Sequence, residues 1–192
     1  MEELTRIQFY FEWSKMISIT SKYLRQKDHA IVRKYARFVL DKLVRLGVQK
    51  KSRITIKILG EQEIKDAADL LDLKKYKAWC TYDGYDDQGN KKFTIVLDYK
   101  HLNKRGKKPI TRLKNLLVDL GHELTHVKQY LNNEIFDYKD GSVRYKGVIF
   151  DDSYNQDEEA YYMSPWEIEA YGREWGLYKM FCKMLKQERL SS

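Results

Sequence analysis

Hydrophobic positions recur along this 192-residue chain with two different periods, which separate helical from extended segments. Two helices are predicted first, because apolar residues return there every three or four positions. The first helix carries Leu4, Ile7, Phe11, Ser14 and Ile17. The second carries Ile31, Tyr35, Phe38, Val39, Leu43 and Leu46, and Gly47 is a suitable C-cap for it. Residues 1–52 are therefore expected to form an N-terminal helical pair.

The period shortens to two after this pair, which predicts strands. The segment RITIKIL (53–59) alternates strictly, so one face of a half-buried strand receives Ile54, Ile56 and Ile58. A short helix is expected around residues 62–73. Two further strands, YKAWCTY (76–82) and KFTIVLDY (92–99), flank the turn-forming segment DGYDDQGN. A three-stranded sheet is thus predicted in the middle of the chain.

A long amphipathic helix is predicted after this sheet. A basic loop over residues 100–114 contains Pro109, and Thr111 can cap the helix that follows. The apolar stripe of that helix is Leu113, Leu116, Leu117, Leu120, Leu124, Val127 and Leu131.

The last part of the chain is predicted to contain a hairpin and a final helix. The hairpin spans 136–150 around Asp140-Gly141, and Ser164-Pro165 starts a helix that runs to about Leu190. The expected buried face of this helix is Tyr171, Trp175, Tyr178, Phe181, Cys182 and Leu185. The whole pattern predicts an α+β fold in which the helical pair packs on a main domain formed by residues 53–192.

The sequence GHELTHVKQY (121–130) places two histidines four residues apart on the long helix. His122 and His126 then project from one helical face, and both can bind a single tetrahedral zinc ion at about 2 Å. Glu123 is rotated roughly 100° away from His122, so it is placed to take a proton from a water that the metal activates rather than to bind the metal. This HExxH pattern predicts a catalytic zinc site, because the chemistry requires both the histidine spacing and the glutamate.

A catalytic zinc ion needs a third protein ligand and one open position. In the stretch SPWEIEAYGREW, Glu167 shares a helical face with Ala170, Tyr171 and Glu174, next to the aromatic core face. A carboxylate beside a small residue suits a zinc pocket between two helices, so Glu167 is the preferred third ligand. The alternative role for Glu167 is a first-turn carboxylate stabilised by the helix dipole.

Three other side chains are considered for the metal site and rank below Glu167. Glu169 points with Arg173, and this face of the last helix is expected to meet solvent. His29 and His101 remain possible ligands, but a polar turn and a basic loop are expected to expose them.

The segments HELTHVKQY and PWEIEAY together resemble the gluzincin group of zincin metallopeptidases. More narrowly, they resemble small metallopeptidase-like proteins encoded by tailed bacteriophages. The resemblance covers about residues 53–180 and implies one zinc ion per chain, bound by His122, His126 and Glu167, the last in an ExxA setting, with Glu123 as general base. It also implies a minimal zincin-like fold made of a small sheet, an active-site helix and a glutamate-bearing helix.

The chain departs from the gluzincin pattern at Tyr171, where many gluzincins carry an aspartate that binds the first histidine. The residue that stabilises the oxyanion is also open, with Tyr161, Tyr162 and Tyr171 as candidates. The resemblance further implies that an extended peptide adds to the strand nearest the cleft, and KFTIVLDY (92–99) is expected to be that strand.

These residues predict a zinc-dependent peptidase that hydrolyses peptide bonds of an intracellular protein. The alternative is a non-catalytic zincin-fold binding protein whose basic surface engages nucleic acid, for which the net charge of +8 is the reason. The 100–114 loop concentrates the cations Lys100, Lys104, Arg105, Lys107, Lys108, Arg112 and Lys114. No nucleic-acid motif accompanies them, and a solvated lysine-rich surface is the simpler interpretation.

Composition and terminal sequence bear on the compartment. The chain is 43% hydrophobic and 33% charged, and no window approaches the roughly 18 apolar residues that a membrane span needs. Cys80 and Cys182 lie far apart and form no CxxC pair, which suits a reducing compartment. The N-terminus lacks the pattern of a signal peptide. A cytoplasmic protein without a membrane partner is expected, in the host cytoplasm if a phage encodes it.

Overall fold

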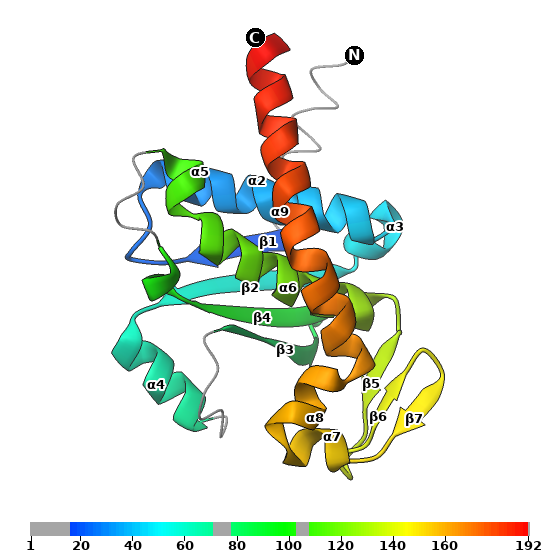
Figure 1. The fold of residues 1–192 in the computed structure, drawn as a ribbon. Helices are drawn as coiled ribbons and strands as arrows, with labels where there is room; N and C mark the ends of the chain where they lie inside the picture. Colours follow the sequence, from blue (N-terminus) through cyan, green and yellow to red (C-terminus); the bar gives the residue numbers. More distant parts are fainter. Residues whose placement is uncertain (1–15, 71–77, 103–107, 192) are drawn as a thin grey trace.

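A four-stranded sheet lies at the centre of the computed structural model, which describes residues 16–70, 78–102 and 108–191 (Figure 1). Its strands are β1 (Ile17–Thr20), β2 (Ser52–Leu59), β4 (Lys91–Asp98) and β3 (Ala78–Tyr85), in that spatial order. β1, β2 and β4 run parallel, whereas β3 is antiparallel to β4. β1 and β3 are therefore the edge strands of this sheet.

The strand β1 corrects the prediction for the N-terminal segment. Ile17 was expected to close a first helix, yet it begins a strand that pairs with Ile54 of β2. The short run ISIT is rich in β-branched residues, and Ile17 is fully buried where it joins the sheet. The rest of the predicted first helix, residues 1–15, lies outside the described residues. The sheet has four strands instead of three because this segment adds to its edge.

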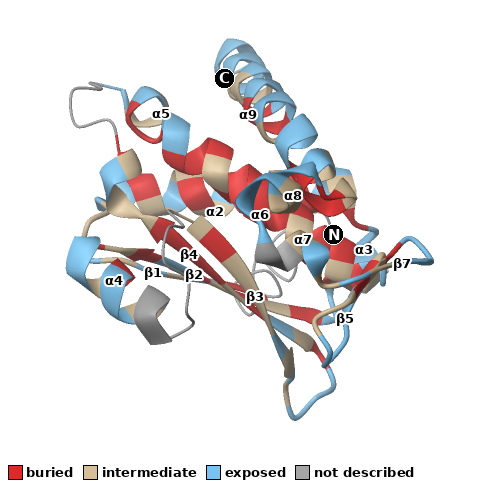
Figure 2. Cartoon of the chain, turned by 60° about the horizontal axis from the view of Figure 1, so that its bottom comes forward, coloured by how far each residue is buried: buried red, intermediate tan, exposed pale blue. Residues whose placement is uncertain are grey.

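The other predicted strands are confirmed, with boundaries shifted by one to three residues. The alternation of β2 buries Ile54, Ile56 and Ile58 together, as its pattern indicates. In β4, Phe93, Ile95 and Leu97 join the same core. Figure 2 shows this buried layer between the sheet and the helices above it.

Two long helices, α2 (Gln26–Leu43) and α6 (Lys114–Leu131), cover one face of the sheet, and a third, α9 (Pro165–Ser191), packs on α6. α6 packs on β3 and β4 and also contacts α2 and α9. α4 (Glu61–Leu70) lies near the opposite face, where Ile64 packs against Trp79 and Val96. The predicted second helix ends at Leu43, earlier than expected, and the short helix α3 (Leu46–Gln49) follows.

No helix in the described ranges is both long enough and apolar enough to cross a membrane.

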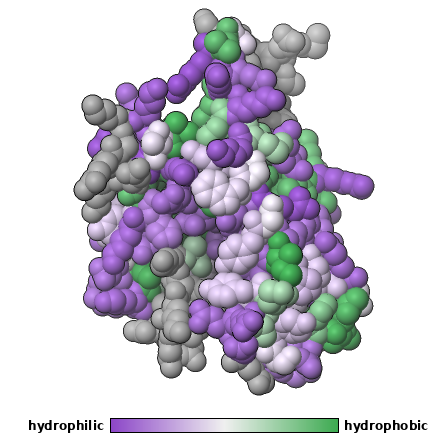
Figure 3. Space-filling model, in the orientation of Figure 1, coloured by the Kyte–Doolittle hydropathy of each residue, from purple (hydrophilic) through white to green (hydrophobic). Residues whose placement is uncertain are grey.

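Short elements connect the long ones. They are the 3₁₀ turn η1 (Tyr99–His101), α5 (Pro109–Arg112), β5 (Ile135–Asp137), β6 (Val143–Tyr145), β7 (Val148–Phe150), α7 (Ser153–Gln156) and α8 (Glu158–Met163). The predicted hairpin is a three-stranded antiparallel sheet, β5-β6-β7, with the Asp140-Gly141 turn between its first two strands. Exposed Phe136, Val148 and Ile149 belong to this sheet, and apolar atoms gather over it at the lower right of Figure 3.

The buried face of α9 differs in part from the prediction. Tyr178 and Phe181 are buried as expected, and Trp166 and Ala170 join them. Tyr171 and Trp175, in contrast, are each 45% exposed. The Trp175 ring receives the ammonium group of Lys114 at 4.9 Å from its centroid, so this side of α9 faces α6 at the surface rather than the core. The residues of the helix from Lys186 onward are exposed, and its C-terminal end projects from the body of the protein (Figure 1).

Gly121 of α6 lies next to Tyr35 of α2 and Glu174 of α9. A Cβ atom at this position would lie 2.5 Å from the hydroxyl oxygen of Tyr35 and 3.6 Å from the backbone oxygen of Glu174. Tyr35 is fully buried, and its ring packs edge-on against Phe181. Within the described part of the chain its hydroxyl group has no hydrogen-bond partner. A glycine is needed here because the buried tyrosine lies against the helix backbone.

We expect Gly121→Ala to destabilise the protein by about 1–3 kcal/mol, because the added methyl group overpacks a rigid site. Tyr35→Phe removes the hydroxyl group, and the nearest remaining atom of that ring is the carbon 3.6 Å from the added methyl group. In this background Gly121→Ala should be neutral, or should stabilise the protein by up to about 1 kcal/mol through helix propensity. Urea unfolding of the four proteins measures this cycle. An equal cost in both backgrounds would show that Tyr35 is not the obstacle.

Candidate metal centre

Two histidines on α6 and one glutamate on α9 converge on a single point. The Nε2 atoms of His122 and His126 lie 3.1 Å apart, as their spacing of one helical turn predicts. Glu167 approaches with both carboxylate oxygens, Oε2 at 3.1 Å from the first histidine and Oε1 at 3.2 Å from the second. In the described part of the chain, this is the one group of three or more side chains placed to hold a metal ion.

The three side chains lie close enough together to bind a single metal ion. Ligands placed tetrahedrally at about 2.0–2.1 Å from zinc lie about 3.3–3.4 Å from one another. The Nε2 atoms of His122 and His126 are 3.1 Å apart, close to that value, and one ligand atom from each of the three residues lies within 4.8 Å of the others. Two imidazoles and a carboxylate also form a donor set that suits zinc. His122, His126 and Glu167 are therefore the residues that would hold a zinc ion.

The start of α9 fixes the position of Glu167. Pro165 opens the helix, and Trp166 anchors its first turn in a cluster with Tyr145, Phe150 and Tyr154. Glu167 is only 2% exposed, and its carboxylate contacts the two histidines. The structure thus brings together the three predicted ligands, and Glu167 also lies in the first turn of α9, as the alternative role beside the helix dipole requires.

Each histidine also has a hydrogen-bond partner on its other ring nitrogen. The Nδ1 atom of His122 lies 3.2 Å from Glu174 of α9, and that of His126 lies 2.9 Å from the amide oxygen of Gln129. The sequence prediction left the partner of the first histidine unassigned. The spacing of seven residues between Glu167 and Glu174, two helical turns, is the signal that could have identified it.

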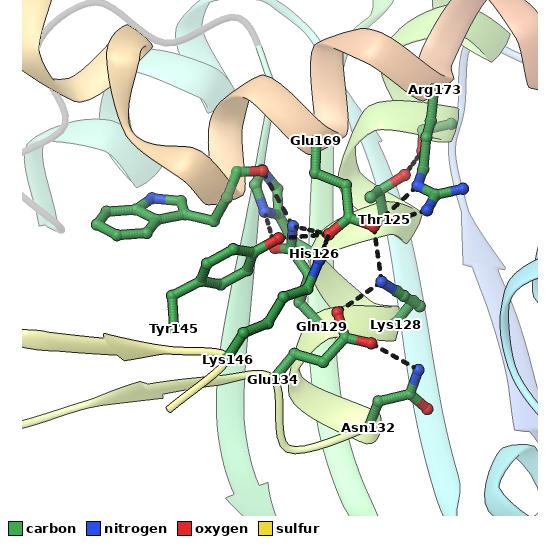
Figure 4. A network of polar contacts seen from close by, with 12 residues as sticks. Thr125, His126, Lys128, Gln129, Asn132, Glu134, Tyr145, Lys146, Glu169 and Arg173 are labelled. Atoms are coloured by element: carbon green, nitrogen blue, oxygen red, sulfur yellow. Dashed lines mark hydrogen bonds and ion pairs between the residues drawn. The ribbon is translucent and has the colours of Figure 1, made fainter. Parts of the chain in front are cut away.

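Glu169 contradicts the prediction that it faces solvent. Its side chain is 11% exposed, and it accepts hydrogen bonds from Lys128, Tyr145 and Arg173. The hairpin sheet and α6 cover this side of α9, and sequence periodicity contains no information about that cover. Figure 4 shows Glu169 at the centre of the resulting network.

A cavity of about 680 Å³ lies in front of the candidate ligands. Its size is typical of ligand-binding sites, and its walls come from β3, α6, β5, β6, α8 and α9. The aromatic residues Tyr161, Tyr162 and Tyr171 line it, and the Tyr171 ring stands edge-on to His122 with 4.4 Å between ring centroids. These three tyrosines remain the candidates for stabilising an oxyanion.

Glu123 lines the same cavity and is buried. Burial raises the pKa of its carboxyl group to about 7, although the nearby His126 and His122 lower it. Among the described residues, none donates a hydrogen bond to this carboxylate. A general base works best when its pKa lies near the working pH, so the environment of Glu123 suits that role.

The histidines and Glu167 shift one another's proton affinity. Burial lowers the pKa of His122, but its hydrogen bonds to Glu167 and Glu174 outweigh this effect and raise the pKa to about 10. For Glu167, burial raises the pKa, yet the contacts with His122 and His126 bring it below its ordinary value. A carboxylate and a protonated imidazole thus balance each other's charge at the point where a metal ion fits.

The two remaining histidines occupy different environments. His101 lines the cavity and contacts Asp119 through Nδ1, so the prediction of an exposed loop position is wrong for it. Asp119 lies one turn before His122 and Glu123 on α6. His29 lies on α2 and does not line the cavity.

The strand expected to receive a peptide is not at an edge. β4, which contains most of KFTIVLDY, pairs with β2 on one side and β3 on the other, so its backbone groups are already bonded. β3 is the edge strand, and its residues Ala78–Thr81 line the cavity. The prediction failed because strand order depends on pairing between distant segments.

The basic loop is described only in part, since residues 103–107 lie outside the described ranges. Lys100 pairs with Glu61, and buried Arg112 pairs with Asp28. Lys114 contacts the ring of Trp175. Several of the cations counted in the sequence therefore make contacts within the protein, and nucleic-acid binding stays a prediction.

Comparison of the chain with protein-family models, with curated proteins and with solved structures gave no match. The likeness to gluzincins accordingly rests on the motif residues of the sequence.

Proposed function

We propose that this protein is a zinc-dependent peptidase that hydrolyses peptide bonds of a protein substrate. The observation that carries the proposal is the convergence of His122, His126 and Glu167 at the wall of a cavity that Glu123 also lines. A bound zinc ion would lower the pKa of a water molecule to about 7 and polarise a carbonyl group.

The side chains of the protein would supply the remaining functions. Glu123 would take the proton of the attacking water, since its carboxylate is buried, lines the cavity and has a raised pKa. Glu174 and Gln129 accept from the two Nδ1 atoms and so orient the metal-binding rings. The outer edge of β3, which pairs with no other described strand, would bind an extended peptide by backbone hydrogen bonds.

The proposal predicts about one zinc ion per chain in the protein purified without a metal-affinity tag. Glu167→Ala should lose or weaken this zinc, because it removes one of three ligands. Glu159→Ala is the matched control, since Glu159 is exposed on α8 and does not line the cavity. Glu169→Ala would be a poor control, because this residue holds Lys128 and Tyr145. Elemental mass spectrometry measures the content, and an absence of metal after zinc is supplied would refute the proposal.

Zinc affinity should rise with pH. The contacts that raise the pKa of His122 to about 10 keep a proton on the imidazole at neutral pH, so the metal must displace it. For each proton that is released when zinc binds, the zinc affinity rises about tenfold per pH unit, at pH values below that pKa. Competition with a chromophoric chelator between pH 6.5 and 8.5 measures the slope, and calorimetry in buffers of different ionisation enthalpy counts the protons. An affinity independent of pH would contradict the proton-linked site.

Glu123→Gln should keep zinc and lose hydrolysis by about 10²–10⁴-fold, because the amide cannot accept the proton of water. Cleavage of a quenched-fluorescent peptide library by the zinc-loaded proteins measures the loss, with Glu159→Gln as the control. Cleavage by Glu123→Gln at the wild-type rate would exclude the general-base role.

A further inference from the structure

Gln129 lies one turn beyond His126 on α6 and is fully buried, at 0% exposure. Its Oε1 atom is 2.9 Å from Nδ1 of His126. Its Nε2 atom donates to the backbone oxygen of Trp166 at 2.9 Å and to the carboxylate of Glu169 at 3.3 Å. Both polar atoms of this side chain are therefore hydrogen-bonded: Oε1 to the candidate ligand His126, and Nε2 to α9.

The chemistry of these partners determines which way the amide faces. A backbone oxygen and a carboxylate only accept hydrogen bonds, so they require the NH₂ group of Gln129, which has two protons to donate. The oxygen of the amide must then face His126, whose Nδ1 can only be a donor to it. A neutral His126 with its proton on Nδ1 has its lone pair on Nε2, the atom that approaches Glu167.

Glu169 is itself held from three elements, which makes it a fixed acceptor. Lys128 of α6 donates at 2.7 Å, Tyr145 of β6 at 2.6 Å and Arg173 of α9 at 2.9 Å. Lys128 also binds Glu134 at 2.5 Å, and Lys146 pairs with Glu169 at 3.4 Å (Figure 4). The network joins the hairpin sheet to both helices of the candidate site.

We propose that Gln129 is a positioning residue that holds His126 with its proton on Nδ1 and its Nε2 turned toward the metal, and that α9 sets the orientation of Gln129 through Trp166 and Glu169. The proposal rests on the metal site put forward above. Because Trp166 and Glu169 lie on either side of Glu167, one turn of α9 supplies the third ligand and also orients the second. The site thus depends on α9 in two ways.

Two variants separate this role from a structural one. Gln129→Met keeps the length of the side chain and removes the acceptor for His126. Gln129→Glu keeps an acceptor for His126 but has no proton for Trp166, and it places a second carboxylate beside Glu169. Both variants should lower the free energy of unfolding. If Gln129 is only structural, zinc binding falls in both; if it is a positioning residue, zinc binding falls in Gln129→Met and recovers in Gln129→Glu.

Zinc dissociation into a chelator in excess gives the first readout. We expect dissociation to be about 10–100-fold faster from Gln129→Met than from the wild type, and within about threefold of the wild type from Gln129→Glu. Gln49→Met is the matched control, because Gln49 is also buried and donates to two backbone oxygens, those of Leu40 and Val44, but does not line the cavity. Its zinc dissociation should equal that of the wild type.

The second readout is the Nδ1 proton of His126, observed by NMR in ¹⁵N-histidine-labelled protein without metal. It should exchange slowly with water in the wild type and in Gln129→Glu, and rapidly in Gln129→Met. An Nδ1 without a proton in the wild type, or equal zinc dissociation from all variants, would overturn the positioning role. If the wild type binds no zinc, the proposed function fails, and the NMR result still decides whether Gln129 fixes His126.

Discussion

The contact between α6 and α9 is the constraint on which the candidate site depends. His122 and His126 come from one helix and Glu167 from the other, so the three metal-binding atoms meet only when the helices are packed together. The same contact carries the hydrogen bond between Nδ1 of His122 and the carboxylate of Glu174, and the one that Gln129 donates to the backbone oxygen of Trp166. One residue before the first ligand, Gly121 leaves room for the buried Tyr35 hydroxyl of α2 against the same helix. The packing of this interface therefore also determines the geometry of the candidate metal site.

Burial gives this contact its electrostatic character. Taken out of water, the carboxylate of Glu167 needs a positive partner, and two imidazoles surround it. Glu169, two residues on, is balanced instead by Lys128, which is itself buried. The first turn of α9 thus places two carboxylates in the interior, each with a different kind of cation. Of these partners, an imidazole can release its proton and bind a metal through the freed nitrogen.

Local spacing was enough to predict the candidate ligands. Positions four apart on a helix share a face whatever surrounds them, so His122 and His126 followed from α6 alone, and the helical face of Glu167 pointed to the third ligand. Predictions failed where the answer depended on distant segments. The pairing of Ile17 with Ile54, the inner position of β4 and the cover over Glu169 are all set by tertiary contacts. Tyr171 has an apolar ring at a helical spacing typical of a core, yet it stands at the cavity beside His122.

The length of α9 separates the candidate site from the far end of the helix. Its first turn carries Glu167, its middle inserts Leu177, Tyr178 and Phe181 into the core, and its residues from Lys186 onward are exposed. Core packing therefore fixes the central part of the helix. Fraying of the exposed end costs little free energy because it breaks few buried contacts. The packed turns between this end and Glu167 do not take part in that motion. Substitutions near the C-terminus of the helix should thus alter its local flexibility and leave the geometry of the candidate ligands unchanged.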